Sequence, residues 1–380
     1  MRIHDFPLET EMASVVTANS LGNLNDITKD LPSLQFENAL SEDEKGPYLI
    51  LRKRSHAITV SACAQATYFV AVLNEARQKI LHLKTPQQSK SSKFLQKAPP
   101  RDPVKIGIIG CGRIGNHLAN CLLTYADVLP QELLISTRRP ETLAQLKKKG
   151  IECIYDNVKV ASSVHLLFLC VLPSQMATVA DDIRTIIPPH CTVYTFLSSV
   201  PILRLRRMLN AQAIIRPEFT WERFGGGEEE MWDCSKDVCI TLENQEQVEM
   251  TCPLAEMKTS IVQTKEKWAE MILYSFVNMC TREGLEKEQT IAVTNEVVLG
   301  QSPNQEYLTE FRALDFTRRP TLFPVFDMSA VATNQTPLTQ TITENHELRA
   351  LFVKKYKDVF DKFYYWKGIK QIKPKTQENT

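Results

Sequence analysis

The most constraining stretch of the chain is an apolar run from Val104 to Ile109 that leads directly into three spaced glycines. This pattern predicts a buried strand, a glycine turn and a helix that begins near Arg113. Gly110 permits a tight turn, Gly112 lets the backbone approach a pyrophosphate, and Gly115 lets the helix pack closely on the strand. The free N–H groups and the helix dipole then face the phosphates. The stretch predicts a dinucleotide site made of Gly110, Cys111, Gly112, Arg113, Ile114 and Gly115.

Strands and helices alternate beyond this turn. The apolar run 165–171 is bounded by Leu172 and Pro173, which is typical of a central parallel strand. Further strands are predicted at 132–136, 151–155, 192–197 and 213–216, with helices at 140–149, 157–163, 174–187 (capped by Ser174) and 202–209. The alternation indicates an α/β fold, a Rossmann-type doubly wound parallel sheet. Ligands of such sheets lie outside the carboxyl ends of the strands, which favours the loops at 172–174, 198–200 and 217–221 for nicotinamide and substrate.

The end of the second strand indicates which cofactor is preferred. NAD sites place Asp or Glu there to accept from the ribose 2′-OH, whereas this chain has Ser136, Thr137, Arg138 and Arg139. Arginine binds phosphate through a planar fork, so we expect NADP(H), bound also by Val171, Leu172 and Pro173. The alternative is that both arginines are solvated loop charges before a helix. A methyltransferase, which also uses a glycine turn, would need the missing acidic residue.

The pattern divides the chain into four parts. Residues 1–103 form a partly disordered extension with one long helix, 104–225 the NADP-binding Rossmann domain, 240–368 a helical domain, and 369–380 a polar tail. The extension helix, predicted at 55–83, carries an apolar stripe and either packs on its own chain or docks a partner. Apolar stripes at 268–280, 291–299, 306–316 and 348–363 predict the helices of the later domain.

Composition excludes several other functions. A net charge of +1 over 380 residues favours neither nucleic acid nor membrane as a partner. No stretch has about 18 uninterrupted apolar residues, and the first residues resemble neither a secretory signal nor a transit peptide. Ten scattered cysteines without C-x-x-C pairs suit reduced thiols in the cytoplasm. The histidines and cysteines are not clustered, so we expect no metal site.

Several stretches together resemble the pyrroline-5-carboxylate reductase family over roughly residues 104–300. The stretches are 106–116 with its glycines, 156–158, 167–175, Ile214-Ile215-Arg216 and the helices from Trp268 to Gly300. The resemblance implies a Rossmann domain followed by helices that interlock with a second subunit. It also implies hydride transfer between NADP(H) and a small C=N or C=O substrate, and a homo-oligomer assembled through the C-terminal helices.

The catalytic segments of that family are replaced in this chain. Leu172 stands where the reductases have lysine, 218–220 reads Glu-Phe-Thr instead of Met-Pro-Asn, and 262–268 lacks the family's Ser-Gly-Ser-Gly-Pro-Ala-Tyr. These family segments surround a proline-like carboxylate, so we expect a substrate other than pyrroline-5-carboxylate. Candidates for substrate contact or proton donation are Ser198, Ser199, Glu218, Thr220 and Thr264, each of which also suits a cap or a solvated side chain. The alternative function is a non-catalytic NADP(H)-binding sensor or scaffold.

Overall fold

A six-stranded parallel sheet forms one half of the molecule. The computed structural model describes residues 42–84, 101–221, 237–256, 262–302, 307–318 and 322–366. The strand order is β3-β2-β1-β4-β5-β6, which confirms the predicted Rossmann-type sheet. The strands are β1 (Ile106–Ile109), β2 (Leu133–Ser136), β3 (Glu152–Ile154), β4 (Leu166–Leu169), β5 (Thr192–Thr195) and β6 (Ile214–Ile215). Each is shorter than predicted, but all six are found.

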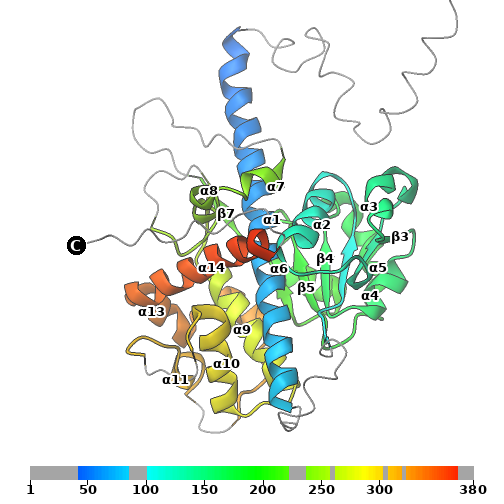
Figure 1. Ribbon diagram of the computed structural model, residues 1–380. Helices are drawn as coiled ribbons and strands as arrows, with labels where there is room; N and C mark the ends of the chain where they lie inside the picture. The colour runs from blue at the N-terminus through cyan, green and yellow to red at the C-terminus, as the bar shows by residue number, and fades with distance from the viewer. Residues whose placement is uncertain are drawn as a thin grey trace, which may run out of the picture.

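Helices flank this sheet (Figure 1). They are α2 (Arg113–Tyr125), α3 (Ala144–Lys148), α4 (Asn157–Ser163), α5 (Met176–Ile183) and α6 (Ile202–Leu209). The predicted helix 140–149 is divided, because a 3₁₀ turn at Pro140–Leu143 precedes α3. The prediction that Ser174 caps α5 is wrong. Pro173 begins a separate 3₁₀ turn that contains Ser174, and α5 starts after it without a side-chain cap.

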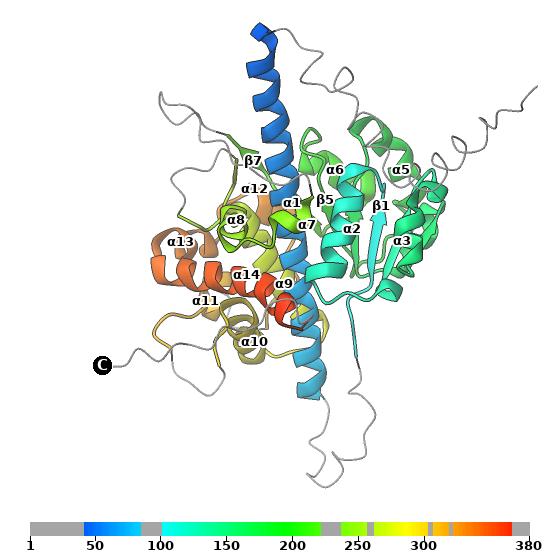
Figure 2. The same ribbon diagram turned by 45° about the horizontal axis from the view of Figure 1, so that its top comes forward.

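The extension helix α1 (Glu42–Lys84) runs between the sheet and the later helices, as both views show (Figures 1 and 2). It packs against α2, α7, α9, α10 and α14, and its side chains Tyr68 and Phe69 are fully buried. The Asn74 amide donates to the Ala126 carbonyl at 3.1 Å and accepts from the Val104 N–H at 2.9 Å. These contacts confirm that the helix packs on its own chain. It begins 13 residues before the predicted Ser55.

One stretch of α1 also has the length and apolarity of a membrane span. Among the described residues, Leu51–Lys84 alone meets that test, but 78% of its most apolar window is buried inside the protein. Burial of this kind is typical of a core helix. The main apolar core accordingly extends from β1 and β4 through α1 to α9 and α14.

The second half of the molecule is mainly helical. Its longer helices are α9 (Lys267–Arg282), α10 (Lys287–Leu299), α13 (Pro337–Glu344) and α14 (His346–Trp366). Its shorter helices are α7 (Val238–Thr241), α8 (Gln245–Met250), α11 (Ala313–Phe316) and α12 (Met328–Thr333). A two-stranded antiparallel ribbon joins β7 (Phe219–Thr220) to β8 (Gln263–Thr264).

The helix predicted at 306–316 is wrong for most of its length, since only α11 is helical in that range. The Asn295 side chain donates to the Phe311 carbonyl at 3.0 Å and accepts from the Phe311 N–H at 2.8 Å. Gln301 likewise donates to the Thr309 carbonyl at 2.5 Å. Side chains on α10 and just after it therefore form hydrogen bonds with backbone groups that would pair with one another in a helix. Residues 1–41 and 85–100 of the predicted extension and the predicted polar tail at 369–380 lie outside the described residues.

Candidate nucleotide site and adjoining pocket

Two of the three glycines are required by the fold itself. Gly110 has φ +89°, and a Cβ there would lie 2.8 Å from the Cys170 carbonyl oxygen. A Cβ on Gly115 would lie 2.4 Å from the Gly110 carbonyl oxygen, which is backbone and cannot swing away. Any larger residue at either position would push β1, the turn and α2 apart.

Gly112 is different, because nothing in the part of the protein that the structure describes requires a glycine there. Its φ is −80°, which other residues adopt, and a Cβ built on it meets no atom within 4 Å. The residue precedes α2, whose first turn has no side-chain cap. We call this place, the open backbone at Gly112 together with the start of α2, the cradle. It suits a phosphate group that approaches the backbone closely.

The thiols next to this cradle are uncharged. Burial raises the pKa of Cys111 to about 12, and it also raises the pKa of Cys170. Both groups remain protonated at neutral pH and do not repel an anion. Arg113 is exposed beside them, and Ile114 is half-buried.

The end of β2 lies against the cradle. The Gly110 N–H donates to the Ser136 carbonyl at 2.9 Å, so the first glycine is tied to the strand end. The Ser136 side chain is only 1% exposed and donates to Asn157 Oδ1 at 2.7 Å. Arg138 and Arg139 are exposed, and within the described part of the chain neither guanidinium has a hydrogen bond or ion pair. Sequence reasoning missed Asn157, although its place directly after the third strand was a usable signal.

The loop after β4 lies on the other side of the turn. A Cβ on Gly110 would come within 2.7 Å of Val171 Cγ1, which places Val171 directly beside the cradle. Leu172 and Pro173 follow it and are exposed. The structure thus gathers the three sequence-predicted groups around one edge of the sheet: the glycine turn, the β2 end and residues 171–173.

A pocket of about 430 Å³ lies near the carboxyl end of β6. It is lined by Pro201, Ile202, Leu203, Arg216, Glu218, Lys265, Lys267, Trp268, Met271, Ala332 and Thr333. Glu218 accepts from Lys265 Nζ at 2.7 Å and from Arg216 Nη2 at 2.5 Å. The hydrogen bond from Lys265, aided by Arg216, holds the pKa of Glu218 below its usual value. Glu218 is therefore a paired carboxylate, which suits orientation of neighbouring cations better than proton donation at neutral pH.

The other predicted site residues lie around Arg216 and the small ribbon. The Ser198 carbonyl accepts from Arg216 Nη1 at 3.5 Å, while Ser198 and Ser199 are themselves exposed. Thr220 is exposed on β7, and Thr264 Oγ1 on β8 accepts from the Gln65 amide at 2.6 Å. Of the residues predicted for catalysis, Glu218 alone belongs to the pocket lining. Sequence reasoning missed Arg216, Lys265 and Lys267, whose charges meet only through the fold.

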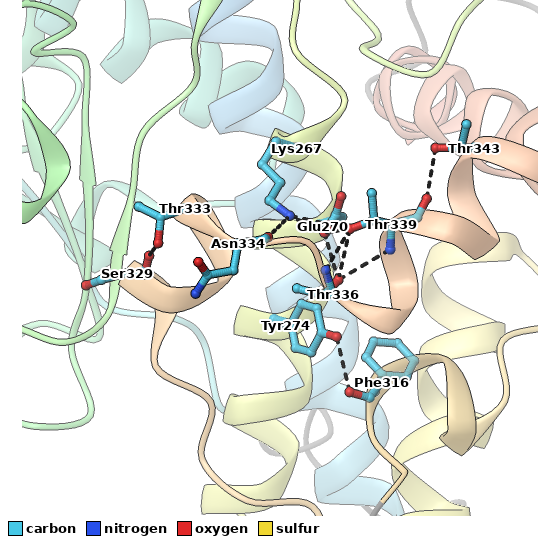
Figure 3. Close-up of polar contacts among 10 residues, drawn as sticks. All are labelled: Lys267, Glu270, Tyr274, Phe316, Ser329, Thr333, Asn334, Thr336, Thr339 and Thr343. Carbon is cyan, nitrogen blue, oxygen red and sulfur yellow. Dashed lines mark hydrogen bonds and ion pairs between the residues drawn. The ribbon is translucent and has the colours of Figure 1, made fainter.

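The buried carboxylate of Glu270 pairs with Lys267, a residue of the pocket lining (Figure 3). Glu270 is 3% exposed, and its Oε2 accepts from Lys267 Nζ at 2.7 Å, Thr336 Oγ1 at 2.8 Å and Thr339 Oγ1 at 2.9 Å. Lys267 also donates to the Asn334 carbonyl at 2.6 Å. The start of α9 is thereby fixed to the start of α13.

We expect Glu270→Ala to lower the free energy of unfolding by about 3 kcal/mol, because it leaves a largely buried ammonium and two hydroxyls without their shared acceptor. Chemical denaturation measures this loss. Glu310→Ala, at an exposed glutamate of the same domain, is the matched control and should change the free energy of unfolding by less than about 0.5 kcal/mol. An equally small loss for Glu270→Ala would contradict the stabilising role of the network.

The chain is similar to several known proteins over parts of different length. Residues 105–193 match the family described as "NADP oxidoreductase coenzyme F420-dependent". The mouse NADP-dependent oxidoreductase domain-containing protein 1 is 31% identical over 350 residues, which cover 88% of this chain and 93% of that protein. The pyrroline-5-carboxylate reductase of Escherichia coli is 29% identical over 106 residues, 28% of this chain and 39% of the reductase. The structure of the Coxiella burnetii pyrroline-5-carboxylate reductase aligns with 69% of this chain and 98% of its own at 18% identity, with a TM-score of 0.28.

Proposed function

The chain belongs to the family of NADP-dependent oxidoreductase domain-containing protein 1, which is related to the pyrroline-5-carboxylate reductases, and from this we propose its function. We propose that it binds NADP(H) and transfers a hydride between this cofactor and a C=N or C=O substrate other than pyrroline-5-carboxylate. The observation that carries the proposal is the cradle at Gly112, where the backbone is bare although the fold does not require it. A pyrophosphate that rests on this backbone accounts for the glycine.

The proposed cofactor contacts continue outward from the cradle. Gly110, Cys111, Gly112, Arg113, Ile114 and Gly115 surround the pyrophosphate, and Val171, Leu172 and Pro173 lie toward the nicotinamide. Ser136, Thr137, Arg138 and Arg139 form the ribose end. The two guanidinium groups have no partner among the described residues, which supports recognition of a 2′-phosphate, since a planar fork binds phosphate well.

The substrate is proposed to bind in the pocket beside Arg216. NADPH, when bound, supplies the hydride, and the protein orients the substrate and provides a proton. Glu218 holds Arg216 and Lys265 in place, and Ser198, Thr220 and Thr264 lie around them as the hydroxyl candidates. The replacement of the reductases' carboxylate-binding segments in this chain supports a substrate other than pyrroline-5-carboxylate.

The proposal extends to assembly and location. A homo-oligomer through the C-terminal helices is supported by the exposed apolar side chains on and around α11: Leu308, Leu314, Leu322 and Val325, of which Leu308 is 98% exposed. A small-molecule substrate is the proposed partner, and near-neutral net charge favours neither nucleic acid nor membrane. The cysteines that the structure describes are free thiols, which supports the reducing cytoplasm.

We expect Arg138→Ala combined with Arg139→Ala to weaken NADPH binding at least about tenfold, because two charge-assisted hydrogen bonds to the 2′-phosphate are lost. NADH binding should stay within about twofold of its original value, because NADH has no such phosphate. Fluorescence titration of the purified protein gives both dissociation constants. Arg207→Ala, at an exposed arginine on α6, is the matched control and should change neither.

Two outcomes of this titration would contradict different parts of the proposal. If the unmodified protein binds neither nucleotide, the cofactor site and the oxidoreductase activity both fail. If it binds both and the double variant leaves their ratio unchanged, the arginines do not select NADPH. A protein that binds NADPH but oxidises it with no imine or ketone in a turnover screen would be a binding protein without catalysis.

A further inference from the structure

A chain of three polar side chains links the end of β2 to α5. The Ser136 hydroxyl donates to Asn157 Oδ1 at 2.7 Å, and Asn157 Nδ2 donates to Asp182 Oδ2 at 2.9 Å. The three residues come from β2, α4 and α5 and share no sequence motif. Ser136 is buried, Asn157 is half-buried and Asp182 is exposed, so the chain leads from the sheet edge to the surface.

The Asp182 carboxylate fixes which group donates and which accepts in each hydrogen bond of this series. A carboxylate only accepts hydrogen bonds, so the amide nitrogen of Asn157 must face Asp182. The amide oxygen then faces Ser136, whose single hydroxyl proton is used in donating to it. The assignment of the amide therefore follows from its partners. Asn157 cannot offer a second orientation while Asp182 keeps its charge.

Two groups at the exposed end of this hydrogen-bonded series have no partner among the described residues and remain for a ligand. They are the second N–H of Asn157 and the remaining lone pairs of Asp182, which lie side by side because the two residues are hydrogen-bonded. A hydroxyl group accepts and donates at once, so a ribose hydroxyl satisfies both. A phosphate only accepts, so it would gain one hydrogen bond and be repelled by the carboxylate.

We propose that Asp182 supplies, from α5, the acceptor for a ribose hydroxyl that the end of β2 lacks. The inference rests on the proposed nucleotide site. Asp182 favours NADH, whereas Arg138 and Arg139, which follow the end of β2, favour the 2′-phosphate of NADPH. The ratio of the two affinities is set by the balance between this carboxylate and the arginines.

Asp182→Asn tests the inference, with Asp181→Asn as the matched control. The variant keeps the shape of the side chain and removes its charge. Asp181 lies one residue away on the same helix, is equally exposed, and has its ion pair with Arg184 at 3.7 Å. We expect Asp182→Asn to weaken NADH and to retain or strengthen NADPH, so that the ratio of the dissociation constants for NADH and NADPH rises about tenfold, as for the loss of one charge-assisted hydrogen bond.

Titration of the three proteins with NADH and NADPH separates the outcomes. A rise of the ratio in Asp182→Asn alone, with an unchanged melting temperature, supports the assignment. No rise, or the same rise in Asp181→Asn, overturns it, because the second result would be a general effect of charge on α5. If both nucleotides bind the unmodified protein and only the ratio fails to respond, the nucleotide site stands while the role of Asp182 fails. Absence of binding to all three proteins overturns both.

Discussion

Gly112→Ala should retain the thermal stability of the unmodified protein and weaken NADPH binding at least about 100-fold. The affinity falls because the added methyl group occupies the place where the backbone would contact the pyrophosphate. A Cβ at this position meets no protein atom within 4 Å, and φ −80° suits alanine. The added methyl group therefore meets no steric clash. Gly112 is the N-cap of α2, a position that disfavours alanine, and this cost opposes the gain from reduced freedom of the unfolded chain. The free energy of unfolding should therefore change by less than about 1 kcal/mol.

Thermal unfolding and nucleotide titration of the same sample check both halves of this result. Retained affinity would show that the pyrophosphate does not rest on Gly112 and would remove the observation on which the proposed function depends. A large loss of stability would mean instead that the residue has a packing role. This is the most direct test of the site, because the single Cβ added at residue 112 should change NADPH affinity without changing the stability of the fold.

Gly115→Ala, unlike Gly112→Ala, should destabilise the protein. We expect a loss of about 3 kcal/mol in the free energy of unfolding, as in severe overpacking. The added Cβ would lie 2.4 Å from the Gly110 carbonyl oxygen, so α2 must move away from the turn. Nucleotide binding should fail as well, because the same movement displaces the helix start from the cradle.

Urea denaturation measures the stability loss, and Gly112→Ala is its matched control, since it adds the same methyl group three residues earlier. Equal stability of the two alanine variants would contradict the close packing of Gly115 on Gly110. The pair also tests the assignment of roles within the motif, because Gly115→Ala should damage the fold and binding together, whereas Gly112→Ala should damage binding alone.

The sheet and its glycine turn could be predicted because their signals are local. The apolar run before Gly110, the spacing of the glycines and the alternation of strands with helices are all contained in short windows of sequence. The three glycines look alike in the sequence, however. Only their surroundings show that Gly110 and Gly115 serve the fold while Gly112 is free to serve a ligand.

The rest of the site depends on contacts between distant residues. Glu218 and Lys265 are 47 residues apart and meet because the β7–β8 ribbon joins them. Asn157 and Asp182 are 25 residues apart on neighbouring helices. The same reason explains the wrong helix at 306–316, where Asn295 pairs with the backbone of Phe311. No periodicity within either segment indicates its partner.

The position of α1 has a consequence for the synthesis of the protein. This helix leaves the ribosome early, yet α9, α10 and α14, which cover much of its apolar surface, are made last. At bacterial or eukaryotic elongation rates the wait is roughly 15 to 60 seconds. During that time the surface of α1 that faces these later helices has no permanent cover, so the nascent chain should engage a chaperone until α14 has emerged.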